Sequence, residues 1–103
     1  MSEISELNPS APLGAILAAT VEGAPVAVIH TKAGWVMVED VCPHASCAFT
    51  DDGEVLDGTT LICNCHGSEF DLESGDLLRG PALDPLRIRP LLVDGGRLRC
   101  VDR

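Results

Sequence analysis

The stretches CPHASC (residues 42–47) and CNCHGSEF (residues 63–70) hold four of the five cysteines and two of the three histidines of this 103-residue chain. Thiolates and imidazoles are the side chains that proteins use to bind transition metals. The first stretch contains Cys42-x-His44 and the second contains Cys63-x-x-His66. Each stretch therefore offers one thiolate and one imidazole on a tight loop, which predicts a metal centre held between two loops.

Two kinds of centre fit this donor set. Two thiolates and two imidazoles could bind one Zn²⁺ tetrahedrally, although zinc fingers usually space each ligand pair more widely than C-x-H allows. A [2Fe–2S] cluster with two cysteines on one iron and two histidines on the other would take one ligand per iron from each loop. A lone zinc site leaves Cys47 and Cys65 without a role, and this favours the cluster.

The rest of the chain alternates short apolar runs with turn sequences, a pattern typical of antiparallel strands. The predicted strand regions are residues 15–21, 25–30, 34–40, 54–63, 87–93 and 97–101. Asp57-Gly58 marks a hairpin within the fourth region. Residues 42–52, 63–76 and 80–86 are expected to be loops. The predicted fold class is all-β, a single domain over residues 1–103 with an antiparallel sandwich or barrel base. A small cluster-binding subdomain, about residues 41–82, is inserted in it.

The charge of the chain is strongly acidic and unevenly distributed. The formal net charge is −9, and residues 39–76 contain ten acidic residues and no Lys or Arg. This argues against a nucleic-acid partner, because phosphate binding requires positive charge. An acidic face can instead steer a basic protein partner. The chain starts without a basic, apolar signal sequence and has no apolar run long enough to span a bilayer. These features predict a cytoplasmic protein without a membrane span, monomeric in isolation.

The two loops resemble those of Rieske iron–sulfur proteins, whose motif is C-x-H followed by C-x-x-H. CPH and CNCHGSEFD match this motif, and SGDLLRGPALDPL is similar to the family's TG-x-x-x-x-GPA segment. The resemblance covers residues 20–102. It implies antiparallel sheets with a smaller cluster subdomain and one [2Fe–2S] cluster per chain. By this resemblance, Cys42 and Cys63 bind the buried iron, and His44 and His66 bind the outer iron.

The resemblance also assigns roles to residues beside the ligands. Cys47 and Cys65 occupy the places of the disulfide found in the respiratory branch of the family, so a Cys47–Cys65 bridge is expected. Ser68 matches a position whose hydroxyl donates to a bridging sulfide and raises the reduction potential. Phe70 stands where high-potential relatives have a tyrosine. We therefore expect a potential above that of dioxygenase-type ferredoxins and below that of respiratory Rieske proteins.

No catalytic triad, phosphate loop, flavin site or non-haem iron site is recognisable, so no catalytic residue is predicted. The sequence is interpreted as a one-electron carrier and not an enzyme. It would pass electrons from a reductase to a terminal oxygenase that docks on the acidic cluster lobe. The alternative is a high-potential carrier or a subunit of a respiratory or arsenite-oxidase-like redox complex. A third class is a redox sensor or a small nitrite-reductase-like subunit.

Overall fold

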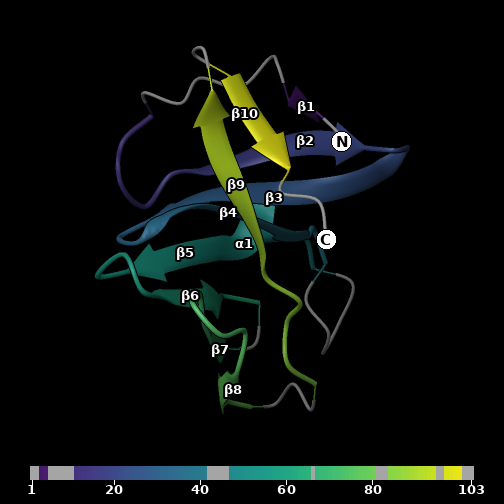
Figure 1. The fold of residues 1–103 in the computed structure, drawn as a ribbon. Helices are drawn as coiled ribbons and strands as arrows, with labels where there is room; N and C mark the ends of the chain where they lie inside the picture. The colour runs from purple at the N-terminus through teal and green to yellow at the C-terminus, as the bar shows by residue number, and fades with distance from the viewer. Residues whose placement is uncertain are drawn as a thin grey trace.

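The protein folds into two antiparallel sheets (Figure 1). The computed structural model describes residues 3–4, 11–41, 47–65, 67–80, 84–94 and 97–100. The six-stranded sheet has the order β1-β10-β9-β4-β3-β2 and the four-stranded sheet the order β5-β6-β7-β8. The predicted all-β class is confirmed. In the part of the chain so described, no helix has the length and apolar character needed to cross a membrane.

The strands are short, and one helical turn interrupts them. The larger sheet contains β1 (Glu3–Ile4), β2 (Ile16–Val21), β3 (Ala24–Thr31), β4 (Gly34–Glu39), β9 (Arg89–Asp94) and β10 (Arg97–Cys100). The smaller sheet contains β5 (Gly53–Leu56), β6 (Thr60–Cys63), β7 (Ser68–Asp71) and β8 (Leu77–Arg79), preceded by α1 (Phe49–Asp52).

Two tight turns set the register of the strands. Glu22 and Gly23, between β2 and β3, have φ values of 52° and 82°. Asp57 and Gly58, between β5 and β6, have φ values of 56° and 71°. Positive φ at both central residues defines the type I′ turn that suits the twist of a hairpin. The predicted hairpin at Asp57-Gly58 is thus confirmed, and its second strand ends at Cys63.

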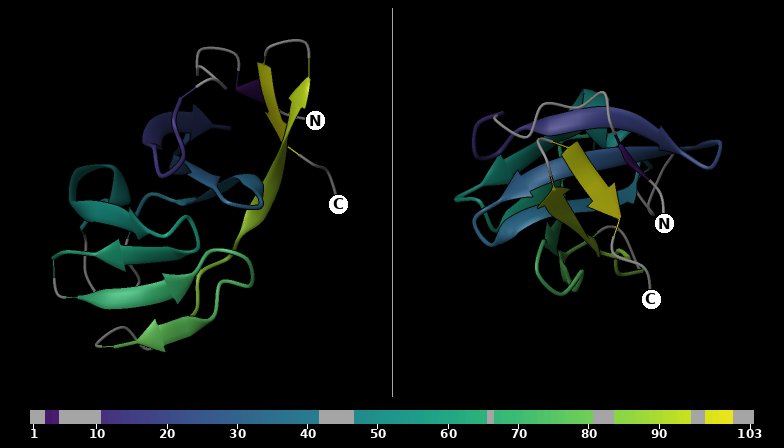
Figure 2. Two further views of the ribbon diagram at one scale, coloured as in Figure 1. Left: turned by 90° about the vertical axis from the view of Figure 1, so that its left-hand side faces the viewer. Right: turned by 45° about the horizontal axis from the view of Figure 1, so that its top comes forward.

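The core lies on both faces of β3. Ala27 and Ile29 pack toward the smaller sheet, in a cluster that also contains Phe49, Leu61 and Phe70. Alternate residues of β3 point to the opposite face, where they meet side chains of β4, β9 and β10. That second cluster contains Val26, Val28, Trp35, Met37, Leu91 and Leu98. The left view of Figure 2 shows the smaller sheet as a separate layer, with the segment that leads into β9 running along its side.

Two expected loops contain regular structure, and here the sequence-based expectation is wrong. Residues 63–76 were expected to be a loop, but β7 lies within them and pairs with β6 and β8. Residues 42–52 likewise contain α1. Strand β7 begins with Ser68 and ends with Asp71, two residue types that are common in turns. Pairing with β6 on one side and β8 on the other outweighs this weak local preference.

Candidate metal centre

Cys63 and Ser68 face each other across the turn that carries the C-x-x-H motif. They are Cα partners in the β6–β7 pairing, so their side chains share one face of the sheet. Both are buried, with 1% and 0% of their surface exposed. The N–H of Gly67 donates to the carbonyl oxygen of Cys63 at 2.7 Å and closes the turn. The thiol that was predicted to bind the buried iron therefore belongs to the core between the sheets.

A disulfide ties the two cysteine-containing stretches together. Cys47 and Cys65, 18 residues apart, are bonded with their Cα atoms at 6.4 Å. This is the bridge that the resemblance implied. The N–H of Asn64 also donates to the carbonyl oxygen of Asp52 at 2.8 Å. The end of the first stretch and the beginning of the second consequently lie side by side, as a shared centre requires.

Helix α1 is fixed at both ends between the first stretch and β5. Its N-cap, Ala48, supplies no side-chain cap. The carboxylate of Asp40 takes that place, accepting from the N–H of Thr50 at 2.9 Å and from its hydroxyl at 2.6 Å. At the other end, the N–H of Gly53 donates to the carbonyl oxygen of Phe49. A Cβ at Gly53 would overlap that same oxygen, so glycine is required there.

Of the four predicted ligands, the structure describes Cys63; Cys42, His44 and His66 lie outside the described residues. Cys63 fits a [2Fe–2S] centre, because its buried thiol lies at the strand end next to Cys65, which the disulfide ties to the first stretch. Another set of possible ligands among the described residues is Cys47, Asp52 and Cys65, whose ligand atoms lie within 4.8 Å of one another. Both sulfurs of that set form the disulfide, so it offers no thiolate to a metal.

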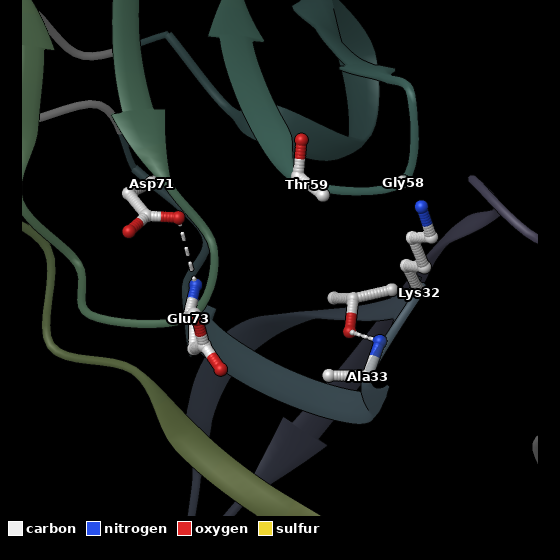
Figure 3. Close-up of a pocket in the computed structure, with 7 residues that line it drawn as sticks. Lys32, Ala33, Gly58, Thr59, Asp71 and Glu73 are labelled. Carbon is white, nitrogen blue, oxygen red and sulfur yellow. Dashed lines mark hydrogen bonds between the residues drawn. The ribbon is translucent and has the colours of Figure 1, made fainter.

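A pocket of about 230 Å³ lies at the opposite end of the β6–β7 hairpin (Figure 3). It is lined by Thr31, Lys32, Ala33, Gly58, Thr59, Asp71 and Glu73. Asp71 pairs with Thr60, at the end of the hairpin remote from the Cys63–Ser68 pair. Cys63, the predicted ligand that lies among the described residues, does not line this pocket.

A two-layer antiparallel fold, with a buried cysteine at the start of a hairpin turn and a disulfide between two cysteine-containing stretches, is the arrangement expected of a small iron–sulfur protein. The chain belongs to the Rieske [2Fe-2S] domain family, which matches residues 3–100. Membership of this family implies one [2Fe–2S] cluster per chain.

The relatives of this chain are ferredoxin components. It is 30% identical over 76 residues to the ferredoxin component of the p-cumate 2,3-dioxygenase system of Pseudomonas putida, covering 74% of this chain and 64% of that protein. It is 33% identical over 73 residues to the 3-phenylpropionate/cinnamic acid dioxygenase ferredoxin subunit of Photorhabdus laumondii, covering 71% and 69%. The chain thus spans about two thirds of the length of these relatives.

Solved structures show the same fold. A chain of the complex of reduced oxygenase and oxidized ferredoxin in carbazole 1,9a-dioxygenase superposes with a TM-score of 0.80 at 25% identity. The superposition covers 95% of this chain and all of that chain. Rieske ferredoxins and this protein therefore share their architecture over nearly the whole length.

Removing the disulfide should destabilise the fold and weaken the retention of iron. In a Cys47→Ser, Cys65→Ser double variant, we expect the free energy of unfolding to fall by about 3 kcal/mol, because a bridge that closes a loop of this length restricts the unfolded chain. Iron release to a chelator should also be faster. Denaturant unfolding of wild type and variant, both without added reductant, measures the first effect. Equal stability of the two proteins would contradict it.

Proposed function

We propose that Cys42, His44, Cys63 and His66 hold the [2Fe–2S] cluster, with the two cysteines on one iron and the two histidines on the other. The buried position of Cys63, opposite Ser68, supports this ligand set. The disulfide supports it too, because it brings the two motif-bearing stretches together. We also propose that residues 41–82, which include β5 to β8, act as the cluster-binding subdomain.

We propose that the protein is a one-electron carrier that takes electrons from a reductase and passes them to the terminal oxygenase of a multicomponent system. The bound cluster supplies the one-electron redox chemistry. The observation that carries this proposal is the similarity to ferredoxin components of dioxygenase systems over 71–74% of the chain. We also propose that the carrier works in the cytoplasm.

The acidic surface beside the loops is proposed as the docking side. Asp51, Asp52 and Glu54, on α1 and β5, are exposed and lie close in sequence to the disulfide-linked Cys47. The carboxylate of Asp52 is within 4.8 Å of both disulfide sulfurs. Carboxylates at this place attract a basic partner and accelerate its association, an effect that salt screens.

The high-potential alternative depends on hydrogen bonds to the cluster. Phe70 is fully buried and stacks edge to face on Phe49, with ring centroids 6.1 Å apart. A phenylalanine has no hydroxyl to donate, so the tyrosine hydrogen bond of high-potential relatives cannot form at this position. This favours the oxygenase-ferredoxin function over a respiratory one.

Ser68→Ala should lower the midpoint potential. A hydrogen bond from Ser68 to the cluster would favour the reduced, more negative state, and a bond to a charged group is worth about 1.5–3 kcal/mol. Because about 1.4 kcal/mol equals 59 mV for one electron, we expect a fall of about 60–130 mV. A potentiometric titration measures the shift. Thr31→Ala is the control, since the Thr31 hydroxyl is also buried but donates to the Gly34 carbonyl. A Ser68→Ala potential equal to that of the control would contradict the assigned role.

The function is tested by electron transfer to an oxygenase. The reduced protein is mixed with the oxidised terminal oxygenase of a p-cumate or 3-phenylpropionate dioxygenase system, and cluster reoxidation is followed by stopped-flow absorbance. We expect rapid reoxidation that slows with rising salt and in an Asp51→Asn, Asp52→Asn, Glu54→Gln triple variant. Reoxidation by cytochrome c but by neither oxygenase would favour the high-potential alternative.

A further inference from the structure

The carboxylate of Asp40 links the two ends of the sequence segment that contains the first metal-binding motif. Asp40 follows the last residue of β4, and Thr50 is the second residue of α1. The two oxygens of Asp40 accept from Thr50 separately: Oδ1 from its N–H at 2.9 Å and Oδ2 from its hydroxyl at 2.6 Å. The nine residues between them in the sequence include Cys42, His44 and Cys47. We call this pair the Asp40–Thr50 clasp.

The clasp is anchored in the core on both sides. On one side, the N–H of Asp40 donates to the carbonyl oxygen of Pro25, which fixes Asp40 to β3. On the other, Phe49 directly precedes Thr50 and is fully buried against Phe70. Asp40 and Thr50 are themselves only partly buried. A hydrogen bond to a charged group in such a place is stronger than a neutral one.

The clasp also acts on the second motif through α1. The hydrogen bonds at Thr50 set where the helix begins, and the helix ends at Asp52. The carbonyl oxygen of Asp52 accepts from the N–H of Asn64, which directly follows Cys63. A displacement of α1 would therefore move the backbone next to Cys63. Both proposed ligand loops thus depend on the same helical turn.

We propose that Asp40 and Thr50 are positioning residues for the metal centre: their two hydrogen bonds hold α1 so that the loops of Cys42 and Cys63 keep the spacing that the cluster needs. This inference rests on the ligand set given under the proposed function. Neither side chain is a cluster ligand, and neither donates a hydrogen bond to the cluster. Their effect is on how firmly the loops retain it.

The test uses variants of Thr50, because they leave every charge unchanged. Thr50→Val keeps the branched shape and the backbone N–H but removes the hydroxyl, and Thr50→Ser restores the hydroxyl. In holoprotein, we expect Thr50→Val to release iron to a chelator about tenfold faster than wild type. We also expect broader EPR features in the reduced state. Thr50→Ser should release iron at close to the wild-type rate. Asp40→Asn is the second variant, and it should also accelerate release.

A matched control lies in the smaller sheet, at the end of the β6–β7 hairpin remote from Cys63. Asp71 accepts from the N–H of Glu73 at 3.2 Å (Figure 3). It also accepts from the hydroxyl of Ser74 at 2.9 Å, so this carboxylate, like that of Asp40, accepts from one backbone N–H and one hydroxyl. Asp71→Asn removes the same charge as Asp40→Asn, and Ser74→Ala removes a similar hydroxyl. Both control variants should release iron at the wild-type rate. Wild-type release from Thr50→Val, or equal acceleration in Ser74→Ala, would overturn the clasp.

Amide hydrogen exchange tests the Asp40–Thr50 clasp independently of the proposed cluster ligands. In Thr50→Val, exchange at the Thr50 and Asn64 amides should be faster than in wild type, whatever metal is bound. Wild-type protein without a Cys/His-type EPR signal would overturn the ligand set, while faster exchange at these two amides would still support the clasp. Unchanged exchange at both amides would overturn the clasp even if the cluster is present.

Discussion

Cys63→Ala should yield a folded protein that contains almost no iron. Cys63 is buried in the core between the sheets. It is the proposed ligand that lies among the residues the structure describes. Without its thiolate, one iron would keep a single protein ligand, and the second stretch would hold the cluster through His66 alone. We expect iron content to fall from about two atoms per chain to near zero, with loss of the visible absorption. Iron and sulfide analysis after anaerobic purification measures this.

The control for that experiment is another cysteine of the same chain. Cys100 lies outside both motifs, in β10 of the larger sheet. Cys100→Ala should retain the iron content of wild type. Retention of iron in Cys63→Ala, or equal loss in the two variants, would contradict the ligand role of Cys63. Far-UV circular dichroism of Cys63→Ala checks that the sheets remain, so that iron loss is not a consequence of unfolding.

Gly75→Ala should have the largest effect on stability among the substitutions considered. Gly75 is buried, has φ of +84°, and accepts at its carbonyl oxygen from the N–H of Leu86 at 2.8 Å. A Cβ at this position would overlap the carbonyl oxygen of Leu86. The left-handed conformation costs a residue with a Cβ about 1–2 kcal/mol. Backbone displacement to relieve the overlap costs about 1–3 kcal/mol more. We expect a loss of about 3 kcal/mol or more in the free energy of unfolding, measured by urea denaturation.

Gly23→Ala separates the two costs. Gly23 has nearly the same φ, +82°, but a Cβ there would meet no atom within 4 Å. In Gly23→Ala, the free energy of unfolding should fall only by the cost of the left-handed conformation, about 1–2 kcal/mol. If the two variants lose the same stability, the contact between the β7–β8 turn and Leu86 is not the reason that residue 75 is a glycine.

The features that could be predicted from the sequence are local ones. The Asp57-Gly58 turn needs only two residues with positive φ, and it was recognisable as a hairpin. The two metal-binding motifs are equally local, because each is complete within four residues. The Cys47–Cys65 bridge came from the resemblance to a family, since five cysteines alone allow several pairings.

The features that could not be predicted depend on packing between distant residues. Strand β7 begins and ends with residue types common in turns, Ser68 and Asp71, and becomes a strand because β6 and β8 flank it. Helix α1 is one turn long and has no side chain at its N-cap. Its cap comes from Asp40, ten residues before Thr50, and no sequence motif connects these two positions. Only the folded backbone brings that carboxylate to the helix.

A redox titration of the anaerobically purified protein, followed by EPR, tests both the Cys/His ligation of the [2Fe–2S] cluster and its work as an oxygenase-type electron carrier. We expect a rhombic signal with a low average g value in the reduced state and a midpoint potential below zero, within the range of Rieske centres. A protein that contains zinc and gives no such signal would contradict the ligand set. A midpoint well above zero would contradict the oxygenase-carrier function.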